Sequence, residues 1–162
     1  MKSFLSWLLA IFLVVCLQSS LTYFISFNSI KPDFALIFVA FAGMVSGREQ
    51  GMIVGFFTGL LYDLLNTGLF GFYSVTFAVI GLYTGTIQKK VYEDSFFLPL
   101  VLVFAFSAFS EVLWNACLLL GGYLNADIQS ILAIAFVRIF YNTLITIPLL
   151  FVFKHVKKFA SD

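Results

Sequence analysis

The sequence predicts an all-α protein: a polytopic membrane bundle of six transmembrane helices, with both termini in the cytoplasm and short second and third spans. The chain of 162 residues is 62% hydrophobic and only 10% charged, and its mean hydropathy is +1.06. Soluble globular domains are about 45–50% apolar and about 25% charged. The apolar residues also fall into six segments, and the basic residues gather on one predicted side of the membrane. We expect one transmembrane domain over residues 1–162.

Polar residues separate the six predicted spans, which lie at about 4–27, 33–47, 51–67, 70–88, 96–121 and 130–154. A helix needs about 20 residues to cross the hydrocarbon core at 1.5 Å per residue. Four segments reach that length, whereas the second and third would be only about 22–26 Å long. The stretch "SGREQ" at 46–50 predicts a tight connection between these two. The alternative is a re-entrant hairpin, which leaves four full spans.

The first segment imitates a secretory signal, because Lys2 precedes an apolar stretch. Its apolar character continues to about Phe27, however, and no small-x-small cleavage pattern follows. We therefore interpret it as an uncleaved first span.

Basic residues predict the orientation of the spans. Six spans with the N-terminus inside place seven basic residues on the inner side: Lys2, Arg48, Lys89, Lys90, Lys154, Lys157 and Lys158. Only Lys31 falls outside, and this bias follows the positive-inside rule. A re-entrant hairpin would bury Arg48 and Glu49 at its tip, which is costly, so two short true spans are favoured.

The third predicted span carries a ladder of glycines that ends in an acid, "GMIVGFFTGLLYDLL" at 51–65. Gly51, Gly55, Gly59 and Asp63 recur every fourth residue and so share one stripe of a helix. Small residues let helices approach closely in membranes, and we expect this stripe to pack on Gly81 and Gly85 of the fourth span. Asp63 would then accept N–H bonds from the turn at 66–71, which contains Gly68 and Gly71.

Three more charged residues lie in or beside the predicted spans. Asp33 follows Pro32 at a predicted helix start, where a carboxylate caps free N–H groups; direct contact with a partner is the alternative. Glu111 and Arg138 fall at similar depths in antiparallel spans, about 15 and 12 Å inward. We expect them to form an ion pair, because an isolated charge at that depth is unfavourable. Asn115 and Asn142 follow them at i+4 spacing, which predicts a polar network.

Several functions are disfavoured by the sequence. There is no basic stripe with interleaved aromatics for nucleic acid. A single histidine and two cysteines in apolar runs form no metal-ligand pattern, and no cofactor motif is present. Asp63 would need a second aspartate at matching depth to form a protease dyad, and no serine or metalloprotease motif is found. We expect the protein not to be an enzyme.

The motifs "KPDF", "GMIVGFFTGLLYDLL" and "NTGLFGFYSVTFAVIGLYTG" resemble the bacterial rod shape-determining protein MreD family. That family's pattern falls here on Pro32, Asp33, Gly55, Gly59, Leu60, Leu61, Asp63, Gly68 and Gly71. Phe70 stands in a turn that often has proline before Leu-Gly in the family, which is a mild departure. Glu111 and Arg138 fall on no motif of the family.

The resemblance implies a non-enzymatic scaffold in the bacterial inner membrane, within the cell-elongation machinery of peptidoglycan synthesis. Its partners would be membrane lipids, the single-span protein MreC, the actin-like MreB, a peptidoglycan polymerase and a transpeptidase. The architecture is also similar to six-helix substrate-binding subunits of vitamin transporters. That alternative expects Asp33, Asp63, Glu111 and Arg138 to line a pocket open to the outside.

Overall fold

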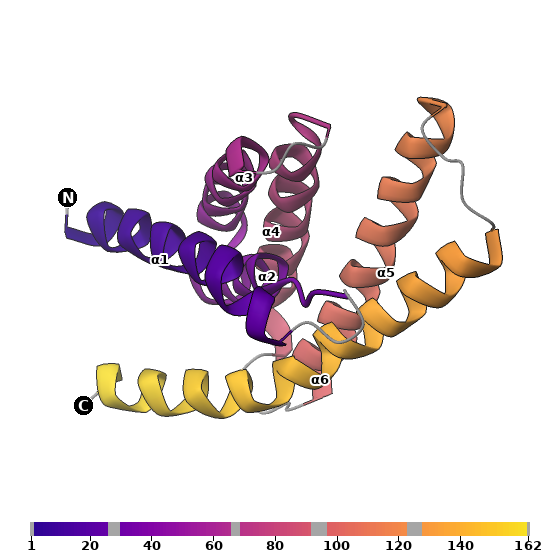
Figure 1. The fold of residues 1–162 in the computed structure, drawn as a ribbon. Coiled ribbons are helices and arrows are strands. Elements are labelled where there is room, and N and C mark those ends of the chain that lie inside the picture. The colour runs from indigo at the N-terminus through magenta and orange to yellow at the C-terminus, as the bar shows by residue number, and fades with distance from the viewer. Residues whose placement is uncertain (1, 26–29, 66–68, 92–96, 123–127, 162) are drawn as a thin grey trace.

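The computed structural model describes residues 2–25, 30–65, 69–91, 97–122 and 128–161. Their regular structure consists of six α-helices and no strand, which confirms the predicted all-α class (Figure 1). The helices are α1 (Lys2–Ile25), α2 (Phe34–Ser46), α3 (Arg48–Leu65), α4 (Phe72–Val91), α5 (Phe97–Leu120) and α6 (Ile128–Ser161).

Most helix bounds lie close to the predicted spans, with two differences. The prediction of a five-residue connection at 46–50 is wrong, because α3 already begins at Arg48. Gly47 alone makes the turn, with a φ of 85° that favours glycine. Glu49 then lies in the first turn of α3, where a negative charge complements the helix dipole. At the other end of the chain, α6 continues past residue 154 to Ser161, with Pro148 inside it.

Short α2 lies at the centre of the bundle and packs against all five other helices. Nine of its 13 residues are buried, and Val39, Ala40 and Phe41 are completely inaccessible. Its neighbours bury the remaining core around it, including Phe77 of α4 and Val103 of α5. An unusually apolar, short second helix is therefore consistent with a core position.

The α3–α4 hairpin is the tightest helix pair of the fold. A Cβ atom added at Gly51 would lie 2.5 Å from the Gly81 carbonyl oxygen and 2.7 Å from Gly43 Cα. One added at Gly85 would lie 2.5 Å from the Gly47 carbonyl carbon. Backbone therefore contacts backbone along the predicted stripe. Gly43 of α2 also lies against this stripe, a contact that was not predicted from the sequence.

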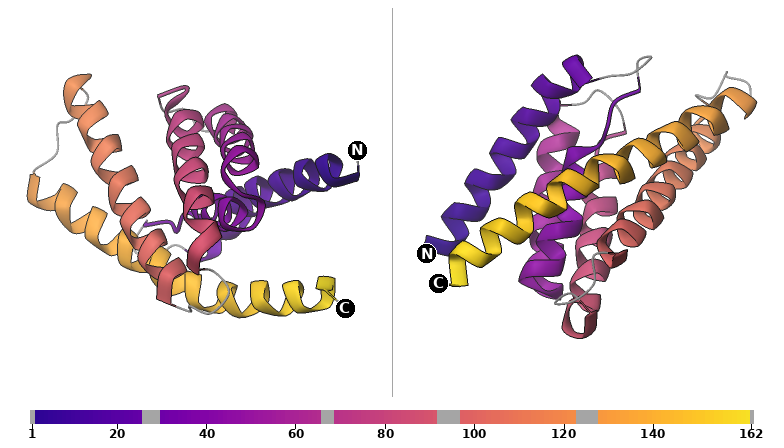
Figure 2. Two further views of the ribbon diagram at one scale, coloured as in Figure 1. Left: turned by 180° about the vertical axis from the view of Figure 1, so that it is seen from behind. Right: turned by 90° about the horizontal axis from the view of Figure 1, so that it is seen from below.

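Helices α5 and α6 pair with each other on one side of the α1–α4 body (Figures 1 and 2). Among the described residues these two helices contain the stretches long and apolar enough to cross a membrane alone, Phe97–Leu120 and Gln129–Phe151. The stretches Trp7–Gln18, Phe34–Ser46 and Phe72–Ile87 are apolar but shorter. Six spans and their orientation remain a prediction.

Candidate functional site: a polar cavity lined by five helices and the segment before α2

Asp63, near the end of α3, caps the N-terminus of the next helix, α4. Its Oδ1 accepts a hydrogen bond from the Tyr73 backbone N–H at 3.1 Å, and its Oδ2 accepts from the Ser74 N–H at 2.9 Å and the Ser74 hydroxyl at 2.6 Å. The carboxylate is 4% exposed. Tyr73 and Ser74 belong to the first turn of α4, whose N–H groups have no partner within the helix.

The described donors to Asp63 lie in α4, and residues 66–68 of the turn expected to donate lie outside the described residues. Within that turn, Gly71 has a φ of 91° and a Cβ there would meet nothing, so its role is backbone geometry. Gly68 lies outside the described residues.

Asp33 is the N-cap of α2, and its Oδ1 accepts from the Leu36 N–H at 2.9 Å. Two side chains from other helices hold the same segment. Gln18 of α1 donates to the Pro32 carbonyl and accepts from the Phe34 N–H, at 2.9 and 2.8 Å. Asn142 of α6 accepts from the Asp33 N–H at 2.8 Å and donates to Ser107 Oγ of α5 at 3.1 Å.

The structure brings Glu111 and Arg138 together across the α5–α6 pair. Arg138 Nη1 donates to Glu111 Oε1 at 2.6 Å, and the two side chains are 32% and 12% exposed. Arg138 Nε is buried and has no hydrogen-bond partner in the part of the chain that the structure describes. Asn115 does not join the pair, because its amide donates to the Glu111 carbonyl of its own helix. The predicted network therefore divides into this ion pair and the separate Asn142 contacts.

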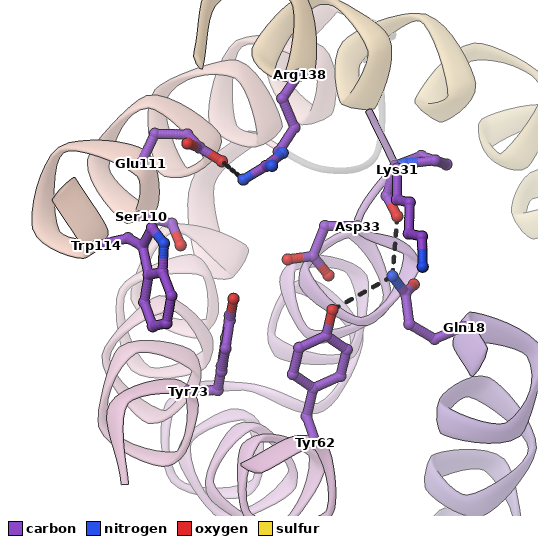
Figure 3. A pocket seen from close by; sticks show the side chains of 10 residues that line it. Gln18, Lys31, Asp33, Tyr62, Tyr73, Ser110, Glu111, Trp114 and Arg138 are labelled. Carbon is purple, nitrogen blue, oxygen red and sulfur yellow. Dashed lines mark hydrogen bonds and ion pairs between the residues drawn. The ribbon is translucent and has the colours of Figure 1, made fainter. Parts of the chain in front are cut away.

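These groups surround a cavity of about 160 Å³ (Figure 3). Five helices, α1 and α3 to α6, and the segment 31–33 that precedes α2 supply the lining. The lining residues are Gln18, Lys31, Pro32, Asp33, Tyr62, Tyr73, Ser110, Glu111, Trp114 and Arg138. It lies at the Asp33 end of the bundle, which we define as the end where α2 begins, α3 ends and α4 begins. Because α5 and α6 continue well beyond Glu111 and Arg138, the cavity is recessed beside them.

One wall of the cavity is aromatic. The rings of Tyr62 and Tyr73 meet edge to face with centroids 4.5 Å apart, and Trp114 stacks on Tyr73 at 5.7 Å. The opposite wall carries Arg138 and Glu111, with Asp33 and Lys31 beside it (Figure 3). The lining therefore has two cationic and two anionic side chains around a small polar space.

The charged and aromatic side chains of this lining can bind a small polar group. Asp63 does not line the cavity, since its two oxygens are engaged at the start of α4. Within the described ranges no group of three potential metal ligands is found.

Sequence reasoning missed Gln18, Tyr62, Tyr73 and Trp114 as site residues. For Gln18 the signal was a lone amide in the apolar stretch "VVCLQSS".

The long apolar helices and the charged groups enclosed among the six helices define a helical protein of membrane type. The family model described as rod shape-determining protein MreD matches residues 1–159, essentially the whole chain. The chain belongs to the MreD family and is involved in rod shape determination. No curated protein and no solved structure matches it.

Proposed function

We propose that the protein is a non-enzymatic scaffold subunit of the cell-elongation complex in the bacterial inner membrane, docking MreC through its helices. Family membership over residues 1–159 carries this proposal. MreB, a peptidoglycan polymerase and a transpeptidase would be further members of the same assembly. Loops among the described residues are short, so a partner has mainly helix surfaces to contact.

The α6 ridge is our candidate docking surface for the single span of MreC. We define it as Leu132, Phe136, Phe140 and Leu144, which recur every fourth residue and are 54–64% exposed. Residues at this spacing form one continuous apolar row along a helix. A helix packing beside this row would bury large side chains, the kind that dominate the energy of interfaces.

Truncating the α6 ridge should weaken MreC binding. We expect the double change Leu132→Ala and Phe136→Ala to lower MreC recovery by pull-down at least about tenfold, the effect of losing a strong contact residue. The matched control is Leu9→Ala with Phe12→Ala on α1, where both side chains are 63% exposed. Equal MreC recovery with both double variants, at equal membrane levels, would reject the ridge as the docking surface.

The six spans and cytoplasmic termini are part of the proposal. The positive-inside bias supports them, and the N and C ends lie on the same side of the molecule in all three views (Figures 1 and 2). With an even number of spans, both termini must lie on the same side of the membrane.

Cysteine labelling tests this topology after Cys16 and Cys117 are replaced by serine. We expect a cysteine introduced at Asn125 to react with a membrane-impermeant reagent from outside, and one at Glu93 to react only after permeabilisation. Both positions lie outside the described residues. The reversed pattern would invert the model, and reaction of both from outside would contradict six spans.

The cavity bears on the substrate-binding alternative. It does reach Glu111, as that alternative expects, but its volume of about 160 Å³ is small. Pockets for drug-sized ligands measure about 300–1,000 Å³. Asp63, expected in the pocket, is outside it. We therefore do not propose transport.

A further inference from the structure

We propose that the polar cavity and an adjoining apolar groove together bind one phospholipid with a zwitterionic headgroup. The headgroup phosphate would contact Arg138 and Lys31, its ammonium group would face Asp33 and Glu111, and one acyl chain would occupy the groove. This site is independent of the proposed docking of MreC on the α6 ridge.

The groove has a volume of about 240 Å³ and an apolar lining contributed by α1, α2 and α6. On α2 the lining residues are Phe34, Ile37, Phe38 and Phe41, which share one face of the helix. This row begins immediately after Asp33 and extends about 10 Å along the helix axis. The groove therefore leads from the level of the cavity toward the middle of the bundle.

The groove is open sideways to the surroundings of the bundle. Leu17 of α1 and Leu149 of α6 form its two sides, and in the described parts of these helices no two Cα atoms lie within 8 Å of each other. A flexible hydrocarbon chain fits such a slot. A 10 Å length of helix, with its diameter of about 10 Å, would occupy on the order of 800 Å³ and does not fit.

The cavity supplies charge complementarity for a zwitterion. Arg138 uses Nη1 for Glu111, and its side chain is 32% exposed, so other N–H groups of the guanidinium can donate to an oxyanion. Lys31 lines the same space and is exposed. Asp33 and Glu111 bring two negative charges to the same space. A ligand that carries only negative charge has no cationic group to face these two carboxylates, whereas a zwitterion does.

The size of the cavity agrees with a compact headgroup. At about 30 Å³ per water molecule in the liquid, its 160 Å³ corresponds to about five water molecules. This space admits a phosphate group and a short amine arm. The position fits as well, because the short helices α2, α3 and α4 end beside the cavity, where a headgroup reaches polar side chains without passing a long apolar wall.

Native mass spectrometry of the full-length, delipidated protein in detergent tests the proposal. Four probes are added at equal concentration: phosphatidylethanolamine, phosphatidylglycerol, diacylglycerol with the same chains, and glycerophosphoethanolamine without chains. We expect phosphatidylethanolamine to be retained at least about tenfold more than each of the others, because each lacks a charged contact or the chain. Equal retention of all diacyl probes, or stronger retention of phosphatidylglycerol, would overturn the assignment.

Matched variants locate the bound lipid. Lys31→Gln should lower retention at least about threefold, whereas Arg48→Gln, the same change in charge outside the cavity, should not. Leu17→Trp fills the groove and should lower retention, whereas Leu13→Trp on the same helix, 51% exposed and outside the groove, should not. If each variant behaves like its control, the lipid does not bind here. Because MreC is absent from these measurements, their result is separate from the scaffold proposal.

Discussion

Replacement of Gly55 by leucine is expected to separate α3 from α4 and to lower the amount of folded protein in the membrane. A Cβ atom at Gly55 would lie 2.7 Å from the Phe77 carbonyl carbon and closer still to its oxygen. These are backbone atoms, so no rotamer change makes room and a whole helix has to move. Overpacking a core costs about 1–3 kcal/mol and sometimes more, and we expect a cost of at least about 3 kcal/mol here.

The control for Gly55→Leu is Phe56→Leu, which introduces the same side chain one residue further along α3. Phe56 is 42% exposed and lies away from α4, so we expect nearly normal abundance. The measurements are the membrane level by immunoblot and the melting temperature of the purified protein. Similar values for the two variants would show that the backbone contact does not determine the α3–α4 packing.

The register of this contact explains why glycine recurs every fourth residue. The contacts pair Gly47 with Gly85, Gly51 with Gly81, Gly55 with Phe77 and Gly59 with Tyr73. Each step of four residues along α3 is matched by a step of four back along α4, as expected for an antiparallel pair. At Gly51, Gly55 and Gly59 the backbone of α4 fills the space that a side chain would need.

The sequence therefore predicted this part of the fold well, because glycine spacing is a local signal of close helix packing. The cavity was much harder to predict. Its lining comes from five helices and the segment before α2, and contacts such as Gln18 with Phe34 depend on the three-dimensional crossing of α1 and α2. No periodicity within one segment carries that information.

Among the polar residues of α5 and α6, one contact was likewise predictable from the sequence and others were not. Equal depth in antiparallel spans was enough to place Glu111 beside Arg138. Helical spacing alone suggested that Asn115 and Asn142 would join them. Asn115 instead bonds to its own helix, and Asn142 turns to Ser107 and the start of α2. Spacing identifies a shared face, but rotamers and neighbouring helices decide which partner each amide meets.

Asp63→Asn is expected to destabilise the protein by about 2–3 kcal/mol, the range for losing hydrogen bonds to a buried charged group. The carboxylate accepts three bonds from two residues of α4 with its two oxygens. An asparagine has one acceptor oxygen, so its NH₂ group would face a backbone N–H of Tyr73 or Ser74. The favourable interaction of a negative charge with the N-terminus of α4 would also be lost.

Asp33→Asn is the matched control, because it makes the same chemical change at another helix start. The Asp33 side chain caps α2 by accepting from the Leu36 N–H, and asparagine serves about as well as aspartate at an N-cap. We expect the melting temperature in detergent to fall much further for Asp63→Asn than for Asp33→Asn. Equal falls in melting temperature would mean that the hydrogen-bond donors around position 63 do not require a carboxylate there. A larger loss at 63 explains why the glycine ladder ends in an acid: at this level α4 is only beginning, so a side chain has room and finds unpaired N–H groups to bind.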